Sequence, residues 1–289
     1  MKKKKAYPYL LIGPAIAFML VFVIYPMFYL GYISLTNWNL INPEKKFVGL
    51  KNYATLFHRE EFYTSLFNTC VYTFFTVISI MVIALLLAVW FNKNTKFDTF
   101  GQMAIFTPHI IALVSVAMVW LWLMDPDAGL LNYILGVFGF PPSQWLQSSK
   151  TSMMSIIIVS VWKSVGYYTL IILAALQGIP KEIYEAAELD NTSKIRQFFK
   201  ITLPMISPQL FFLLIVMTID SFKVFETVRV MTSGGPNYST NVLVYYIYDN
   251  AFINMKLGYA AAAGMVLLVI IGLITIVYFK LLAKKVHYQ

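Results

Sequence analysis

Residues 66–91 read LFNTCVYTFFTVISIMVIALLLAVWF and contain no Asp, Glu, Lys or Arg. A helix that crosses the hydrocarbon core of a bilayer needs about 20 mainly apolar residues. This stretch exceeds that length, so it predicts a transmembrane helix.

Five further stretches have the same character, and they are residues 9–35, 103–124, 153–176, 205–224 and 259–282. The first follows a run of lysines, as a signal peptide would, but its apolar part is too long and no A-x-A cleavage site follows it. We therefore expect an all-α fold in which residues 1–289 form a single transmembrane domain of six helices, preceded by a tail of residues 1–8.

The composition agrees with lipid as the main solvent. Hydrophobic residues make up 59% of the chain and charged residues 12%, whereas soluble domains carry about 25% charged residues. The net charge of +9 is explained by the tendency of Lys and Arg to collect in cytoplasmic loops, so no nucleic-acid partner is expected. With both termini inside, thirteen Lys and Arg fall on the cytoplasmic side and seven on longer external loops. This asymmetry predicts a multi-pass membrane protein with cytoplasmic termini.

Several kinds of site are not expected. Cys70 is the single cysteine, and the three histidines lack metal-ligand spacing. The sequence also lacks the G-x-x-x-x-G-K-[ST] run of a nucleotide-binding loop and the common hydrolase motifs. We therefore expect no catalytic residue, no metal ligand and no cofactor in this chain.

The expected internal loop of residues 178–204 reads GIPKEIYEAAELDNTSKIRQFFKITLP. Pro180 suits a first helical position, Asn191 tolerates a left-handed turn, and Thr192 or Ser193 can cap a second helix. The pattern predicts two short helices. Ile183, Tyr184 and Ala187 share a face of the first one, which is either a docking patch for a partner protein or the side of a surface helix that lies at the lipid headgroups.

This loop resembles the EAA loop of the permease subunits of bacterial ABC importers. The run Glu185-Ala186-Ala187, the turn residue and Ile201-x-Leu203-Pro204 match in type and spacing, except that Asn191 stands where the family usually has Gly. The resemblance implies that the loop docks on a separate ATPase, with Glu185, Ala186, Ala187 and Asn191 in the coupling role.

Three further runs resemble the carbohydrate branch of that family, and they begin at Gly49, Asp125 and Thr232. The resemblance implies a heterodimer with a second permease subunit, two ATP-binding subunits that hold ATP and Mg, and an extracytoplasmic solute-binding protein. It implies import of a di- or oligosaccharide by alternating access, with glycerol phosphate or another small solute as the alternative cargo. A channel or an intramembrane enzyme that uses Asp220 or Glu226 is a more distant alternative.

Ionisable residues inside a membrane are costly and mark candidate functional sites. Lys163 and Asp220 fall at similar depths in the fourth and fifth predicted spans, so they are expected either to form a structural ion pair or to line a polar cavity. Helical spacing extends this group to Ser160, Lys163, Ser164 and Tyr167 on one helix and to Asp220, Ser221, Lys223 and Val224 on the other. All of these except Lys223 fall at positions resembling the sugar-contacting positions of maltose permeases, which makes the group a candidate substrate pathway.

Overall fold

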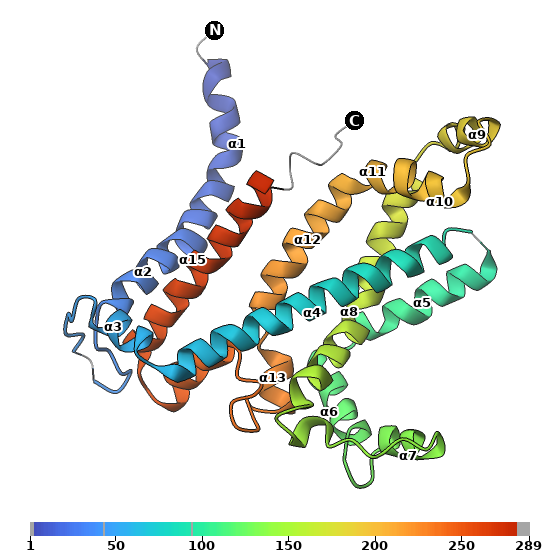
Figure 1. Cartoon of the computed structure of the whole chain (residues 1–289). Coiled ribbons are helices and arrows are strands. Elements are labelled where there is room, and N and C mark those ends of the chain that lie inside the picture. Colours follow the sequence, from blue (N-terminus) through green and yellow to red (C-terminus); the bar gives the residue numbers. More distant parts are fainter. Residues whose placement is uncertain (1–2, 43, 94, 282–289) are drawn as a thin grey trace. The chain divides into compact units, whose positions relative to one another are not determined.

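The computed structural model describes the backbone of residues 3–42, 44–93 and 95–281, and in these ranges every regular element is a helix (Figure 1). The strand-like pairing found there is an isolated antiparallel bridge between Thr36 and Phe47. The all-α prediction is confirmed.

Four helical segments are long and apolar enough to cross a membrane unbroken, and they are Leu11–Ser34, Glu60–Trp90, Ser152–Gln177 and Leu257–Lys280. Two more segments qualify only as pairs of helices with a bend between them. One pair is α5 (Lys96–Ile110) with α6 (Leu113–Leu123), bent by 99°, and the other is Lys194–Met205 with Ser207–Met231, bent by 65°. The expected six spans are obtained when each bent pair counts as one.

The third predicted span, residues 103–124, is broken near Pro108, a residue type that kinks or starts helices. Pro108 lies inside α5, and the helix ends two residues later, at Ile110. Ile111 and Ala112 adopt extended backbone angles, with ψ of 138° and 133°, before α6 begins. Proline removes one backbone donor from a helix, and the break leaves the last carbonyls of α5 without helical partners.

The chain forms two compact units, the first of which comprises Met1–Phe62 and Tyr246–Ile270. In it, the chain just after α2 (Tyr25–Ser34) approaches the first turn of α15 (Leu257–Leu281) closely. The carbonyl of Thr36 occupies the place that a Cβ on Gly258 would take. The Asn52 side chain of α3 (Lys51–Phe57) donates hydrogen bonds to the carbonyls of Ser34 and Thr36, at 2.7 and 2.8 Å.

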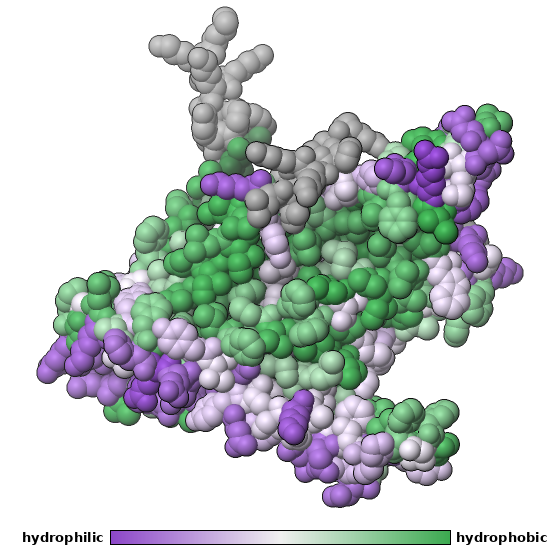
Figure 2. Space-filling model, viewed as in Figure 1, coloured by the Kyte–Doolittle hydropathy of each residue, from purple (hydrophilic) through white to green (hydrophobic). Residues whose placement is uncertain are grey.

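The second unit comprises Tyr63–Tyr245 and Ile271–Gln289. Its helix α8 (Ser152–Gln177) packs against α5, α12 (Ser207–Phe222) and α13 (Glu226–Met231). Hydrophobic side chains cover the exposed sides of α4 (Glu60–Trp90) and α12, whereas hydrophilic ones gather on α9 (Lys181–Leu189) and α10 (Lys194–Gln197) (Figure 2).

Helix α4 has a buried polar face and an exposed apolar face. Its buried polar residues follow the 3–4 spacing of one helical face and are Ser65, Asn68, Thr69, Tyr72, Thr73 and Thr76. Phe67, Phe74 and Phe75 on the opposite side are exposed. Such a helix would be unfavourable in water, but in lipid it directs its polar face toward the interior of the protein.

Candidate functional site

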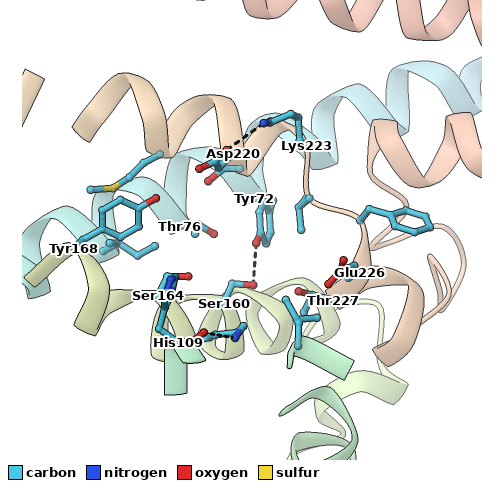
Figure 3. Close-up of a pocket in the computed structure, with 17 residues that line it drawn as sticks. Tyr72, Thr76, His109, Ser160, Ser164, Tyr168, Asp220, Lys223, Glu226 and Thr227 are labelled. Atoms are coloured by element: carbon cyan, nitrogen blue, oxygen red, sulfur yellow. Dashed lines mark hydrogen bonds and ion pairs between the residues drawn. The ribbon is translucent and has the colours of Figure 1, made fainter. Parts of the chain in front are cut away.

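A cavity of about 350 Å³, lined by both polar and apolar side chains, lies within the second unit (Figure 3). Its walls come from α4, the ends of α5 and α6 at their break, α8, α12, the start of α13 and the segment that joins α12 to α13. The volume is at the lower end of the range of about 300–1,000 Å³ typical of small-molecule sites.

The lining is rich in hydroxyl groups and balanced in charge. Hydroxyls come from Tyr72, Thr76, Ser160, Ser164, Tyr168, Ser221 and Thr227. The charged side chains are Lys163, Lys223, Asp220 and Glu226, whose formal charges cancel. Met217, Phe225 and Ile80 add apolar surface. Such a surface offers many hydrogen-bonding groups and carries no net formal charge, which suits a hydroxyl-rich, uncharged ligand.

The Lys163 side chain binds the backbone carbonyls that the break leaves free at the end of α5. Its Nζ donates hydrogen bonds to the carbonyls of Pro108, His109 and Ile111, at 3.2, 3.2 and 2.7 Å. Free carbonyls at a helix C-terminus carry partial negative charge and favour a cation. Of the two alternatives predicted for Lys163 and Asp220, the ion pair does not form, and the Lys163 Nζ binds these carbonyls instead.

Two further contacts hold α5 against α8 next to the hydrogen bonds of Lys163. The backbone of Ile105 lies where a Cβ on Gly166 would be placed, so only glycine permits this approach. The rings of His109 and Tyr167 stack, with centroids 4.5 Å apart and planes 9° from parallel. The broken end of α5 is thereby fixed to α8 by a cation, a glycine and a ring pair.

Asp220 pairs with Lys223, one turn further along at the end of α12, at 3.2 Å (Figure 3). Their side chains are 56% and 54% exposed. An ion pair this open contributes about 0–1 kcal/mol to stability. The charges on this wall are therefore accessible from the cavity and carry little of the fold.

The α4 wall is joined to α8 by one hydrogen bond between hydroxyl groups. Tyr72 Oη donates to Ser160 Oγ at 2.8 Å, and Ser160 Oγ donates to the Ile156 carbonyl at 2.9 Å (Figure 3). His109 Nδ1 is buried beside the cavity and has no hydrogen-bond partner in the described part of the chain. Buried polar atoms are seldom left unpaired, so this nitrogen is an exception within the described residues.

The structure brings the predicted substrate-pathway residues together around this cavity, with one exception. Ser160, Lys163, Ser164, Asp220, Ser221, Lys223 and Val224 all line it. Tyr167 does not, because its ring stacks on His109, and the adjacent Tyr168 lines the cavity instead.

Sequence reasoning missed the contributions of α4, of the α5 break and of α13. Tyr72 and Thr76 lie inside an apolar span. The regular spacing of polar residues from Ser65 to Thr76 indicates a polar helix face and could have identified them. No role was predicted for His109, which was treated only as one of three histidines without metal-ligand spacing. Glu226 was considered only as an acid or base.

The loop between α8 and α12 forms the predicted two short helices, α9 and α10. Asn191 adopts the expected left-handed conformation, with φ of 52°. The Ser193 hydroxyl accepts a hydrogen bond from the Arg196 amide, at 3.4 Å, and so caps α10. The prediction placed Pro180 at the first position of the helix. In the structure α9 begins at Lys181, so Pro180 is the residue before it.

The face of α9 that was predicted to be a docking patch or to lie at the lipid headgroups packs on the protein itself, so this prediction is wrong. Ile183 and Tyr184 pack against the hydrophobic core of the second unit, and Tyr184 Oη lies 2.9 Å from Thr202 Oγ1. Ala187 is 8% exposed. The apolar face of α9 therefore attaches the loop to its own bundle.

The opposite side of the loop is open. Glu185, Ala186 and Asn191 are exposed, and so are the large apolar side chains of Leu189 and Ile195. Lys194 pairs with Glu188 across the turn. These exposed residues form an apolar surface with charged edges, as a docking site requires.

Comparisons with known proteins place these features in a family. The model of the binding-protein-dependent transport system inner membrane components matches residues 53–288. The chain is 37% identical over 286 residues to the Bacillus subtilis (strain 168) protein named "Probable ABC transporter permease protein YurN", covering 96% of this chain and 97% of that protein. It is 35% identical over 283 residues to the sn-glycerol-3-phosphate transport system permease protein UgpA of Shigella flexneri, covering 98% and 96%.

Among solved structures, the chain is similar to one in the crystal structure of a bacterial alginate ABC transporter in complex with an alginate pentasaccharide-bound periplasmic protein. The TM-score is 0.84 at 24% sequence identity, with 99% of this chain and 98% of that chain covered. This likeness supports the fold.

The chain belongs to the family of binding-protein-dependent transport system inner membrane components. It is thus a permease subunit of the ABC importer class and a protein of the inner membrane. Membership favours this class over the channel and the intramembrane enzyme.

Proposed function

We propose that this chain is the transmembrane subunit through which an ATP-driven importer moves a neutral di- or oligosaccharide, with the cavity as part of the substrate pathway. The observation that carries the proposal is the hydroxyl-rich, charge-balanced lining inside a bundle of membrane-spanning helices. The chain acts as one transmembrane domain, residues 1–289, with both termini cytoplasmic, and it exposes the cavity alternately to the two sides of the membrane. It has no ATPase site of its own.

The surroundings of the two lysines favour a neutral sugar over glycerol phosphate, the cargo in the name of the UgpA relatives. A buried phosphate needs cations whose charge is available. Lys163 is engaged by three carbonyls, and Lys223 pairs with Asp220. Glu226 adds a further negative charge to the lining. A dianion would have to draw Lys223 away from Asp220 and would meet the negative charges of both Asp220 and Glu226.

Energy enters through the α9–α10 loop. We place Glu185, Ala186 and Asn191 at the contact with a partner ATPase, where ATP and Mg are bound. Ala187 supports the same contact from beneath, since it is buried against the bundle. A second permease subunit completes the pore and an extracytoplasmic solute-binding protein delivers the sugar, with no cofactor in this chain and no nucleic acid. ATP binding can shift the bundle from one conformation to the other only if ATP binds one of them more strongly.

The cargo is tested by uptake into proteoliposomes that contain the complex purified from its native membrane together with its solute-binding protein. We expect ATP-dependent uptake of a labelled neutral oligosaccharide that unlabelled glycerol 3-phosphate does not compete with. Uptake of glycerol 3-phosphate, with no neutral sugar transported, would replace the carbohydrate assignment and leave the transporter class intact.

The coupling contact is tested by Ala186→Asp, because Ala186 is exposed and its replacement leaves the core of the bundle intact. We expect the ATPase to be lost from the complex purified through this chain. Asn92→Asp adds the same charge at an exposed position of the other short loop on that side and should retain the ATPase. Equal retention by both variants would rule out this docking surface.

A further inference from the structure

Helix α7 (Leu130–Val137) presents an apolar stripe that the described part of the chain leaves uncovered. The stripe is formed by Leu130, Tyr133, Ile134 and Val137, at the i, i+3, i+4, i+7 spacing of one helical face, and all four are exposed. Phe138 and Phe140 extend it and are 73% and 62% exposed. No Asp, Glu, Lys or Arg occurs between Ala128 and Ser149.

The opposite side of α7 is fixed to the protein, so the stripe has a defined direction. Leu131 packs on a hydrophobic cluster that includes Met124. Asn132 Nδ2 donates hydrogen bonds to the carbonyls of Pro126 and Ser143, at 2.8 and 2.9 Å. Its Oδ1 accepts one from the indole N–H of Trp145 at 2.8 Å. The amide network satisfies the polar groups on this side and leaves the apolar stripe facing outward.

The stripe continues an apolar surface that belongs to a membrane span. Helix α6, the second half of the bent span, exposes Val114, Met118 and Trp122. Only the turn from Met124 to Gly129 separates α6 from α7. Within the second unit, α7 lies at the end away from α9 and runs across the direction of α8 (Figure 1). Hydrophobic side chains gather on it in the space-filling view (Figure 2).

The chemistry of the stripe fits lipid better than a protein partner. Protein interfaces carry about one hydrogen bond per 100–200 Å² and are enriched in Arg. Among the six exposed side chains from Leu130 to Phe140 named above, the Tyr133 hydroxyl is the one polar group. Aromatic residues without charge are characteristic of the boundary between hydrocarbon and headgroups. Left in water, each large apolar side chain would cost about 1.5–3 kcal/mol.

We propose that α7 is an interfacial helix that inserts its Leu130–Val137 stripe, with Phe138 and Phe140, into the lipid bilayer at the outer end of the α6 span. It anchors the wall of the cavity that contains Leu113 to the membrane surface. This inference rests on α6 being part of a membrane span and does not depend on the cargo.

The test uses nitroxide labels on single cysteines in a Cys70→Ser background, with the protein purified from its native membrane with its accompanying subunits and reconstituted in liposomes. Val137→Cys and Tyr133→Cys report on the stripe at two positions. Met118→Cys on α6 is the lipid control, and Lys150→Cys, at an exposed charged position of the same loop, is the water control. Collision rates with oxygen and with a water-soluble nickel chelate are measured at each site.

We expect the stripe positions to resemble Met118→Cys, with oxygen collisions exceeding nickel collisions. Nickel collisions as frequent as at Lys150→Cys would show that the stripe lies in water and would overturn the proposal. An immobilised label with both rates low would show that another protein surface covers the stripe, which would also overturn it. Labels at two positions keep the test decisive if one variant fails to fold.

Discussion

The α8 wall and the α12 wall of the cavity carry one lysine each, and the two lysines have different surroundings. Lys163 donates to three backbone carbonyls at the end of α5 and is part of a tight contact between two helices. Lys223 forms a half-exposed pair with Asp220 at the end of α12. The difference shows that a charge inside a membrane protein can serve the fold or face the cavity, and that the partner atoms decide which.

The largest expected effect is on the α8 wall, at Gly166. A Cβ there would overlap the Ile105 backbone, so Gly166→Ala must push α5 away from α8. We expect a loss of stability of about 1–3 kcal/mol, measured as a lower melting temperature of the purified protein. Gly272→Ala is the matched control, because no atom lies within 4 Å of its added Cβ. Equal melting of the two variants would mean that α5 and α8 are not closely packed.

Next in size is Lys163→Met, which leaves the three carbonyls at the α5 break without their donor. These acceptors are part-buried or exposed, so water can replace part of the lost interaction, and the cost should lie near the lower end of about 1–3 kcal/mol. We expect reduced thermal stability and a lower maximal rate of uptake, with part of both restored in Lys163→Arg. If Lys163→Met melted at the temperature of the parent, the three hydrogen bonds of Lys163 would not stabilise the contact between α5 and α8.

A smaller effect is expected for Tyr72→Phe, which removes the hydrogen bond to Ser160 but keeps the ring. The net contribution of such a bond is about 0.5–1.5 kcal/mol. We expect a small drop in melting temperature and a higher KM for uptake. Tyr133→Phe, at an exposed position outside the cavity, should change neither. An unchanged KM for Tyr72→Phe would remove this hydroxyl from the substrate pathway.

The smallest effect on stability is expected on the α12 wall. Lys223→Met breaks an exposed ion pair worth about 0–1 kcal/mol, so the melting temperature should stay near that of the parent while uptake kinetics change. A loss of stability as large as that of Lys163→Met would erase the distinction between the two walls.

Much of this architecture is local and could be predicted from sequence. Apolar length predicted the spans, and residue type predicted the left-handed turn at Asn191 and the cap at Ser193. Helical spacing gathered Ser160, Lys163 and Ser164 on one face because the 3.6-residue period fixes which side chains share a direction.

The rest depends on contacts between distant segments. Counting residues along α8 and α12 placed Lys163 and Asp220 at similar depths but gave neither the rotation of each helix nor the position of the α5 break. That break supplies the carbonyls that Lys163 binds. The direction of α9 was missed for the same reason, since the packing of Ile183 on the core depends on residues far away in the chain.

The central claim is that substrate passes through this cavity, and Ser164→Phe tests it most directly. Ser164 lines the cavity, so a phenyl group there fills space that a sugar would need. Thr107→Phe makes a similar change at an exposed position of α5 outside the cavity. Both variants are measured as the assembled complex in proteoliposomes. The account predicts that Ser164→Phe abolishes carbohydrate uptake while the ATPase stays bound and hydrolyses ATP. Thr107→Phe should keep carbohydrate uptake. Uptake by Ser164→Phe at the rate of the parent would contradict the account.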